Sequence, residues 1–174
     1  MSKSVSVDNF PKPTSITGGC LCGSLRYRVD FPKDHDFLKG SGSCQCTQCR
    51  RNTGAVIFIA HTAPLSGFTF LTSTETLKKF YATPGFQRAF CTNCGSFLYW
   101  RDESLEDVEL AVGCVDPEYL SKFGFALANA SGHNVWCENE IKGVTDHILI
   151  KERGIKWSRN SGSAKFLGKL HEML

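Results

Sequence analysis

The sequence predicts a mainly β protein built from short antiparallel strands around one hydrophobic core. Short apolar or alternating segments recur along the chain, and Gly, Pro, Asn and Ser separate them. Segments with helical periodicity are few. The 174 residues match the usual size of one domain, and a hydrophobic content of 41% with thirteen Phe supplies enough apolar surface for an independent core.

Each predicted strand is a segment of four to six residues rich in β-branched or aromatic side chains. Leu25, Tyr27 and Val29 alternate with two arginines, whereas the run Ala55–Ala60 is apolar throughout and is typical of a strand buried on both faces. The predicted strands are Ser24–Val29, Ala55–Ala60, Phe68–Leu71, Leu77–Tyr81, Gln87–Cys91, Ser96–Trp100, Val108–Val112 and His147–Lys151.

The sequence contains few helix signals. Asp116 followed by Pro117 is typical of an N-cap with proline at the first helical position, and it predicts a short helix to about Phe123. A further turn is expected over Cys46–Asn52, and Gly124–Thr145 is expected to be a long loop or insertion. We expect residues 1–16 to be a lead-in, 17–164 to form the single domain, and 165–174 to be a tail.

Charge and hydropathy exclude two classes of partner. Lys and Arg total 20 and Asp and Glu total 17, so the net charge of +3 argues against nucleic acid as the main partner. No apolar run approaches the ~20 residues that span a bilayer, and the N-terminal residues lack the apolar segment of a signal peptide. We therefore expect a cytoplasmic protein without a membrane partner. Homo-oligomer formation stays open.

Nine cysteines in a reducing compartment call for an explanation other than disulfides, and an odd number weakens the disulfide interpretation further. A Cys-x-Cys pair in extended chain points both thiols to one side, and a Cys-x-x-Cys segment wraps a tight turn, so both spacings suit chelation. Thiolates in a tetrahedral arrangement favour zinc. The chelating groups are Cys20 with Cys22, Cys44 with Cys46 and Cys49, and Cys91 with Cys94.

The number of cysteines predicts two different sites. Cys20, Cys22, Cys91 and Cys94 can supply the four ligands of a closed structural zinc. The remaining group of three leaves one coordination position open, as a reactive zinc requires.

Two alternatives remain at this point. An iron–sulfur cluster is compatible with the spacing, and Cys114, Cys137 or a histidine could close the group of three. We interpret Cys114 as a buried small hydrophobe, and the role of Cys137 is open.

Three ordered motifs resemble those of the glutathione-dependent formaldehyde-activating enzyme family, also called the GFA or centromere protein V family. The resemblance spans about Thr17 to Trp157. It implies a β-tent fold, in which antiparallel sheets are joined by a tetrathiolate zinc, and it implies the same assignment of cysteines to two sites. The motifs are Gly19-Cys20-Leu21-Cys22-Gly23-Ser24-Leu25-Arg26-Tyr27, Cys44-Gln45-Cys46-Thr47-Gln48-Cys49-Arg50-Arg51-Asn52-Thr53-Gly54 and Phe90-Cys91-Thr92-Asn93-Cys94-Gly95-Ser96-Phe97-Leu98.

Two features depart from the family pattern. The family commonly has His between the first two cysteines of the second motif, where this chain has Gln45, which cannot titrate in its place. The stretch Gly124–Thr145 is also longer than usual in the family, so it is expected to reshape the pocket.

The resemblance and the group of three cysteines together predict a zinc-dependent carbon–sulfur lyase with glutathione as co-substrate. Cys44, Cys46 and Cys49 would hold the reactive zinc, and a zinc-bound thiol loses its proton readily. Arg50 and Arg51 are candidates for binding a glutathione carboxylate. His61 is interpreted as a structural histidine. The opposing hypothesis is a non-catalytic binding module with two structural metal sites.

Overall fold

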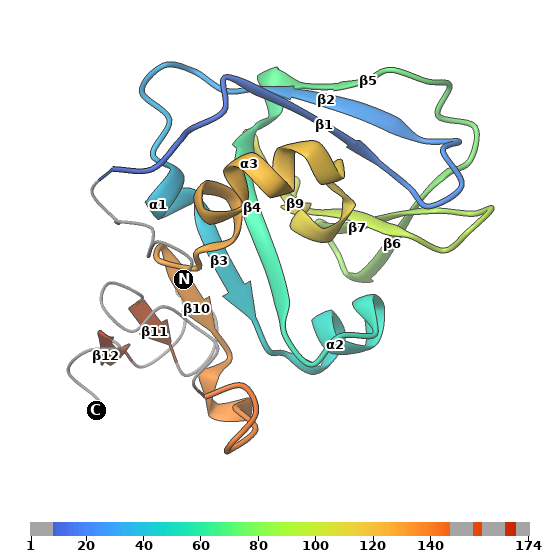
Figure 1. The fold of residues 1–174 in the computed structure, drawn as a ribbon. Helices are drawn as coiled ribbons and strands as arrows, with labels where there is room; N and C mark the ends of the chain where they lie inside the picture. Colours follow the sequence, from blue (N-terminus) through green and yellow to red (C-terminus); the bar gives the residue numbers. More distant parts are fainter. Residues whose placement is uncertain (1–8, 147–154, 158–165, 170–174) are drawn as a thin grey trace.

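The computed structural model describes residues 9–146 together with the backbone of 155–157 and 166–169. Among these residues, the smaller of two sheets has three strands in the order β1-β2-β5, all antiparallel. The strands are β1 (Ser15–Gly19), β2 (Arg26–Asp30) and β5 (Phe68–Phe70). Figure 1 shows this sheet over one side of the molecule, with α2 (Thr47–Thr53) at the opposite end of β3 (Ser41–Cys44) and β4 (Phe58–Pro64).

The larger sheet has nine described strands in the order β12-β11-β10-β3-β4-β9-β8-β7-β6. All its neighbouring strands are antiparallel except that β10 runs parallel to both β3 and β11. The strands are β3 (Ser41–Cys44), β4 (Phe58–Pro64), β6 (Leu77–Thr83), β7 (Phe86–Cys91), β8 (Phe97–Asp102), β9 (Asp107–Ala111), β10 (His133–Val135), β11 (Ile155–Trp157) and β12 (Phe166–Lys169).

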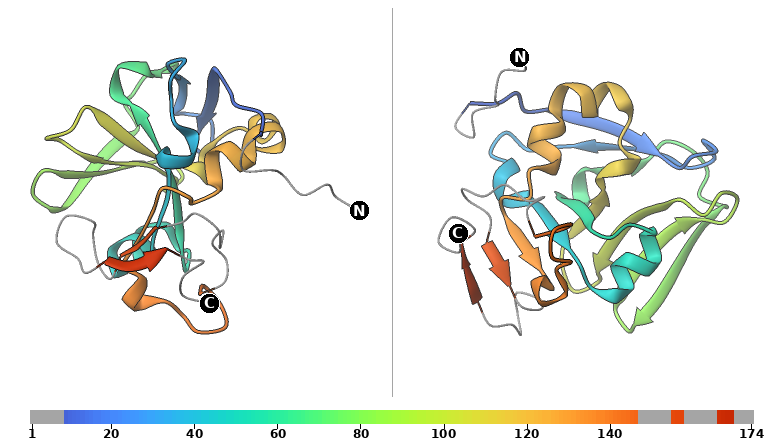
Figure 2. Two further views of the ribbon diagram at one scale, coloured as in Figure 1. Left: turned by 90° about the vertical axis from the view of Figure 1, so that its left-hand side faces the viewer. Right: turned by 60° about the horizontal axis from the view of Figure 1, so that its bottom comes forward.

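Short helices connect the strands and cover part of the core. Among the described residues, α3 is the longest, and it packs against β3, β4 and α1; two views in Figure 2 show it beside the β1-β2 hairpin. The helices are α1 (Phe37–Gly40), α2 (Thr47–Thr53) and α3 (Pro117–Ala128), with single 3₁₀ turns η1 (Leu65–Gly67), η2 (Val112–Cys114) and η3 (Cys137–Asn139).

The main hydrophobic core lies between the two sheets. Ile16 and Tyr27 from the small sheet and Leu98 and Leu110 from the large sheet are fully buried in one cluster, which Leu127 of α3 completes. Because β2 buries alternate residues and β9 buries Val108 and Leu110, each sheet turns one apolar face toward the other. The other face of the large sheet carries polar as well as apolar side chains.

The structure confirms the predicted mainly β fold and corrects several elements. The strand expected over Ala55–Ala60 begins at Phe58. The helix at Pro117 continues to Ala128, and Asp116 precedes it without a side-chain capping hydrogen bond. The predicted long loop Gly124–Thr145 is wrong, because it contains the end of α3, strand β10 and η3.

Strands β1, β3, β10, β11 and β12 were not predicted, and the expected strand His147–Lys151 lies outside the described residues. The first strand begins at Ser15, within the segment expected to be a lead-in, and Phe10 is buried in the core. Strand β12 lies in the segment expected to be a tail. In the described part of the chain, no helix has the length and apolar character of a bilayer span.

Asp116 ties α3 to both strands of the β1-β2 hairpin. Its carboxylate accepts a hydrogen bond from Thr17 of β1 and two from the Arg26 guanidinium of β2, one of them 2.8 Å long. The ion pair is only partly exposed, at 34% for the arginine side chain and 15% for the aspartate. The hydrogen bond from Arg26 lowers the pKa of Asp116 below its ordinary value of 3.8.

We predict that Asp116→Asn lowers the free energy of unfolding by about 1–3 kcal/mol at pH 7, because the Arg26 charge loses its partner. The ionised carboxylate contributes stability above its unfolded pKa, and this contribution is lost as pH falls through the lower folded pKa. The difference from wild type should therefore shrink below about pH 4. Urea unfolding at several pH values measures this difference in stability. Glu118→Gln, which removes a carboxylate at an exposed position, is the control. Equal stability of both variants at pH 7 would contradict this role.

Candidate metal centre

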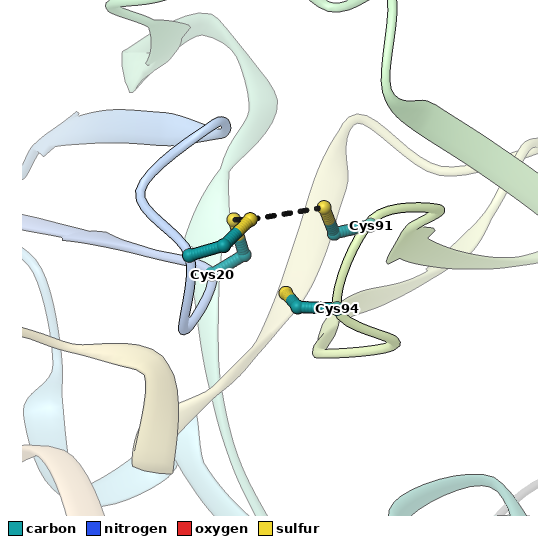
Figure 3. Close-up of side chains that lie close together, drawn as sticks. Cys20, Cys91 and Cys94 are labelled. Atoms are coloured by element: carbon teal, nitrogen blue, oxygen red, sulfur yellow. Dashed lines mark hydrogen bonds between the residues drawn. The ribbon is translucent and has the colours of Figure 1, made fainter.

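Four cysteine sulfurs from two distant hairpin turns meet at one point. Cys20 and Cys22 lie in the turn between β1 and β2, and Cys91 and Cys94 lie at the turn between β7 and β8. All four Sγ atoms lie within 4.8 Å of one another. The Sγ atoms of Cys20 and Cys22 are 3.6 Å apart, and those of Cys22 and Cys91 are 3.8 Å apart. Figure 3 shows Cys20 facing Cys91 and Cys94 across this space.

These distances fit a tetrahedral zinc site. A Zn–S bond of about 2.3 Å places tetrahedral sulfurs about 3.8 Å apart. The backbone of each turn supports the geometry, since the residue after the second cysteine is a glycine with positive φ, 76° at Gly23 and 74° at Gly95. The Leu25 amide donates to Cys20 Sγ at 3.2 Å. We refer to Cys20, Cys22, Cys91 and Cys94 as the four-sulfur cluster.

The four thiols differ in acidity according to their surroundings. Burial raises the pKa of Cys20 to about 11, whereas hydrogen bonds with Ser96 lower the pKa of Cys94 to about 5. Hydrogen bonds with Ser24 likewise lower the pKa of Cys22. A bound zinc would require all four as thiolates, so metal binding and deprotonation are coupled at this cluster.

A second group of sulfurs, the cysteine trio, is built from one short segment. Cys44 ends β3, Cys46 is the N-cap of α2, and Cys49 lies in its first turn. Their Sγ atoms lie within 4.8 Å of one another. The Cys49 amide donates to Cys46 Sγ at 3.2 Å. Hydrogen bonding with Cys44 and Cys49 lowers the pKa of Cys46 to about 2, so one thiol of the trio ionises readily.

The cysteine trio lines a cavity of about 530 Å³ on the large sheet. Its floor is one face of β3, β4, β7, β8 and β9, and its walls come from α2 and from the segment after α3. That segment, which was expected to reshape the pocket, places Trp136 in the wall with a φ of 60°, a conformation rare for an aromatic residue. The residues that line the cavity include Cys44, Cys46, Cys49, Gln48, Phe58, Ala60, Phe86, Arg88, Trp100, Glu109, His133 and Trp136.

Within the described residues, no other Cys, His, Asp or Glu side chain lies close enough to complete the trio. Cys114 Sγ donates to the Phe97 carbonyl at 3.1 Å and Cys137 Sγ to the Asn134 carbonyl at 3.4 Å. Cys114 is half-buried and Cys137 is buried, and neither belongs to a cluster. His61 is 1% exposed and lies 2.9 Å from His35, measured between their Nε2 atoms, in agreement with a structural role.

Gln45 does not line the cavity. Because successive side chains of an extended segment point to opposite sides, the middle residue of Cys-x-Cys points away from the cavity that the two cysteines line. The Gln45 side chain is fully buried there. Its Oε1 accepts hydrogen bonds from Thr145 at 2.7 Å and from Arg50 at 3.1 Å. In this chain Gln45 therefore connects the trio segment to residues 139–145 as part of the scaffold.

The two arginines expected to bind substrate lie outside the cavity lining. The Arg50 guanidinium is occupied by the carbonyls of Val56 and Asn139, each at 2.7 Å. Arg51 is exposed. A contact of Arg50 or Arg51 with the substrate therefore stays a prediction from the sequence.

Arg88 is a cavity residue that the sequence analysis missed. It is 6% exposed, and its guanidinium donates to the Gln48 side chain and to the Phe86 carbonyl at 3.4 Å. Among the described residues, no carboxylate lies within ion-pair distance of it. Hydrogen bonding with Cys44 and the charge of nearby Arg88 lower the pKa of Cys49, whereas hydrogen bonding with Cys46 and burial raise it, and the net shift is upward. The strand periodicity of β7 places Arg88 opposite the core, but sequence alone does not show what covers that face.

Glu109 and His133 also line the cavity and were not predicted as site residues. Glu109 pairs with Trp100, which pairs with Arg88, so these three side chains form one row across the same face of the sheet. Burial raises the pKa of Glu109 to about 7 and lowers the pKa of His133. Their Oε1 and Nε2 atoms are 3.8 Å apart.

The fold and these two clusters define a mainly β protein with one four-sulfur site and one three-sulfur site, each of which could hold a metal ion. The chain belongs to the glutathione-dependent formaldehyde-activating enzyme family, since residues 15–138, more than half of the chain, match it. A solved structure of a Rhodobacter sphaeroides protein is 28% identical over 60% of this chain and 94% of that one, with a TM-score of 0.48.

We predict that Cys46→Ser reduces bound zinc from about two ions per chain to one without unfolding the protein, because only the trio loses a ligand. Cys91→Ser should instead destabilise the fold, since it opens the cluster that joins the two sheets. Metal analysis with circular dichroism measures both effects, and Cys114→Ser, outside both clusters, is the control. Loss of both metals with unfolding in Cys46→Ser would contradict separate sites.

Proposed function

We propose that this protein is a zinc-dependent carbon–sulfur lyase-type enzyme that forms or cleaves a glutathione adduct such as S-hydroxymethylglutathione. The observation that carries the proposal is the position of the cysteine trio. Its three sulfurs line the cavity, and the described residues provide no fourth protein ligand. Family membership supports glutathione as the thiol. Reduced cysteines and a glutathione substrate are compatible with the cytoplasm.

In this proposal the two clusters have different tasks. The four-sulfur cluster holds a structural zinc, because its ligands come from both sheets and complete a tetrahedron. Cys44, Cys46 and Cys49 hold a second zinc at the cavity wall. A zinc bound there would supply a Lewis-acidic position that lowers the pKa of an incoming thiol. Residues 17–164 would act as one domain around both sites.

The proposed reaction joins the glutathione sulfur to the carbonyl carbon of an aldehyde. The thiol loses its proton, the S–C bond forms as the C=O π bond breaks, and the new hydroxyl oxygen gains a proton, so no oxidant or reductant is needed. In the reverse direction the C–S bond breaks and the aldehyde leaves. The residues around the cavity have to orient the thiol and exclude water.

Arg88 supplies the charge that an anionic thiol needs in this cavity. A guanidinium that is 6% exposed and lacks a carboxylate partner among the described residues favours binding of an anion. It lies near Cys49, so the carboxylate that it would bind is one close to the substrate sulfur. Glutathione carries such a group on its glycine. Phe86 and Trp100, stacked with centroids 5.5 Å apart, provide the apolar surface beside it.

We predict that glutathione binds to the zinc-loaded wild type and that Arg88→Gln weakens this binding about tenfold, because a charge-assisted hydrogen bond is lost. Arg51→Gln should change it less than about twofold, because Arg51 lies outside the cavity lining. Isothermal titration calorimetry measures both. A strong effect of Arg51→Gln with none of Arg88→Gln would restore the sequence-based assignment.

The activity itself is tested by exchange NMR with ¹³C-formaldehyde, which separates catalysed from spontaneous adduct formation. We expect zinc-loaded wild type to accelerate exchange between formaldehyde and S-hydroxymethylglutathione, and Cys46→Ser to abolish the acceleration. Glutathione binding that survives unchanged in Cys46→Ser, or the absence of any acceleration by wild type, would overturn the proposal. The second result, with two zinc ions bound, would favour a binding module.

A further inference from the structure

The end of the cavity remote from the cysteine trio carries an acidic side chain beside an indole ring. Glu109 and Trp100 are paired across β9 and β8, so their side chains project from the same face of the sheet. The Glu109 side chain is 25% exposed, and it also borders a second cavity of about 500 Å³. The site is therefore accessible to a ligand that fills the first cavity.

Glu109 has no cationic partner in the part of the chain that the structure describes. Its nearest basic group is His133, at 3.8 Å, and burial lowers the pKa of that imidazole, which keeps it neutral at pH 7. Burial first, and then the charge of Asp107, raises the pKa of Glu109 to about 7. Besides the three thiols of the cysteine trio, the other charged or titratable side chains that line the two cavities are Arg88, His35, Asp36, Lys39 and Asp107.

The position of Glu109 argues against a role in bond making at the trio. Cys44 pairs with Phe58 of β4 and Glu109 pairs with Thr62, so the two residues lie two strands apart and four residues apart along β4. With strands about 4.8 Å apart and a rise of about 3.4 Å per residue, their Cα atoms are about 17 Å apart. Proton transfer needs contact of about 3 Å or one bridging water.

The same separation matches a ligand that extends from the trio to Glu109. Both side chains project from the same face of the sheet, and where they lean toward each other they shorten the roughly 17 Å to roughly 10 Å between a thiol at the trio and a group at the Glu109 carboxylate. Standard bond lengths give glutathione about the same distance between its sulfur and its amino nitrogen. A cation there would contact the carboxylate and the face of Trp100, the aromatic ring that attracts cations most strongly.

We propose that Glu109 and Trp100 form an ammonium-binding subsite that selects thiols with a free amino group remote from the sulfur. This inference rests on the proposed function and specifies one part of its substrate. Arg88 near the trio and Glu109 at the far end then give the cavity opposite charges at its two ends, complementary to a zwitterionic thiol. Glu109 acts in binding, and it is a specificity-determining residue rather than a participant in the bond change.

The test compares glutathione with its des-amino analogue, glutaryl-cysteinyl-glycine, which differs by the loss of the ammonium group. Calorimetry on the zinc-loaded wild type should show glutathione binding about tenfold more tightly than the analogue. Glu109→Gln should reduce this ratio to below about twofold by weakening glutathione alone. Glu106→Gln, at an exposed position directly before β9, should keep the tenfold ratio.

The outcomes separate this inference from the function on which it rests. Equal binding of both thiols by wild type, a measurement that needs no variant, would overturn the ammonium subsite and leave the lyase proposal intact. A preference that persists in folded Glu109→Gln would also overturn it. Failure of both thiols to bind the zinc-loaded wild type would overturn the proposed function and the subsite together.

Discussion

The contact between the Cys20–Cys22 turn and the Cys91–Cys94 turn is the constraint on which the arrangement of the two sheets depends. The β1-β2-β5 sheet and the large sheet are separate hydrogen-bonded sheets in the described structure. The backbone joins β1 to the segment after β9 only at the Gly18–Val115 bridge and at the bond from the Asp116 amide to the Thr17 carbonyl among the bonds found in the described residues, so side chains supply most of the contact between the sheets. Apolar packing between them is not directional, whereas four sulfurs within 4.8 Å of one another specify a point. The Asp116–Arg26 ion pair holds the same hairpin from the side of α3.

The four-sulfur cluster is also connected to the cavity, through the strands that carry two of its cysteines. Cys91 ends β7, the strand that carries Arg88, and Arg88 pairs with Trp100 of β8, so the turn that holds Cys91 and Cys94 connects the two strands that carry these cavity residues. The cysteine trio is positioned independently, by the end of β3 and the start of α2. The candidate site thus combines a locally encoded group of thiols with a sheet face whose alignment depends on contacts between distant segments.

The difference between features set by local spacing and features set by contacts of distant segments explains what could be predicted from the sequence. The cysteine trio and each half of the four-sulfur cluster follow from spacing, because a turn of two to four residues brings its own thiols together. The pairing of the two halves was predicted from the number of ligands and from the family resemblance. Strand β10 could not be predicted, since it is held by buried hydrogen bonds of Asn134 to Ser43 and to the Ala130 carbonyl rather than by an apolar pattern. Arg88 and Glu109 are distant in sequence and look like ordinary outward residues of two strands, so only the pairing of the strands shows that they share a cavity.

Gln45 shows that the residue type at one motif position does not by itself give the role of that side chain, because the strand geometry decides where the side chain points. Because the family commonly has a histidine at this position, Gln45 suggests that the chain has lost a proton carrier. The extended Cys-x-Cys geometry, however, directs the Gln45 side chain into the scaffold, where Thr145 and Arg50 donate hydrogen bonds to it. The charges that face the cavity come from the sheet and from the segment after α3 instead. None of the cavity residues Arg88, Trp100, Glu109 and Trp136 belongs to a turn that holds a cysteine cluster. Substitutions at these four positions could therefore change which thiol the cavity accepts while both sulfur clusters stay intact.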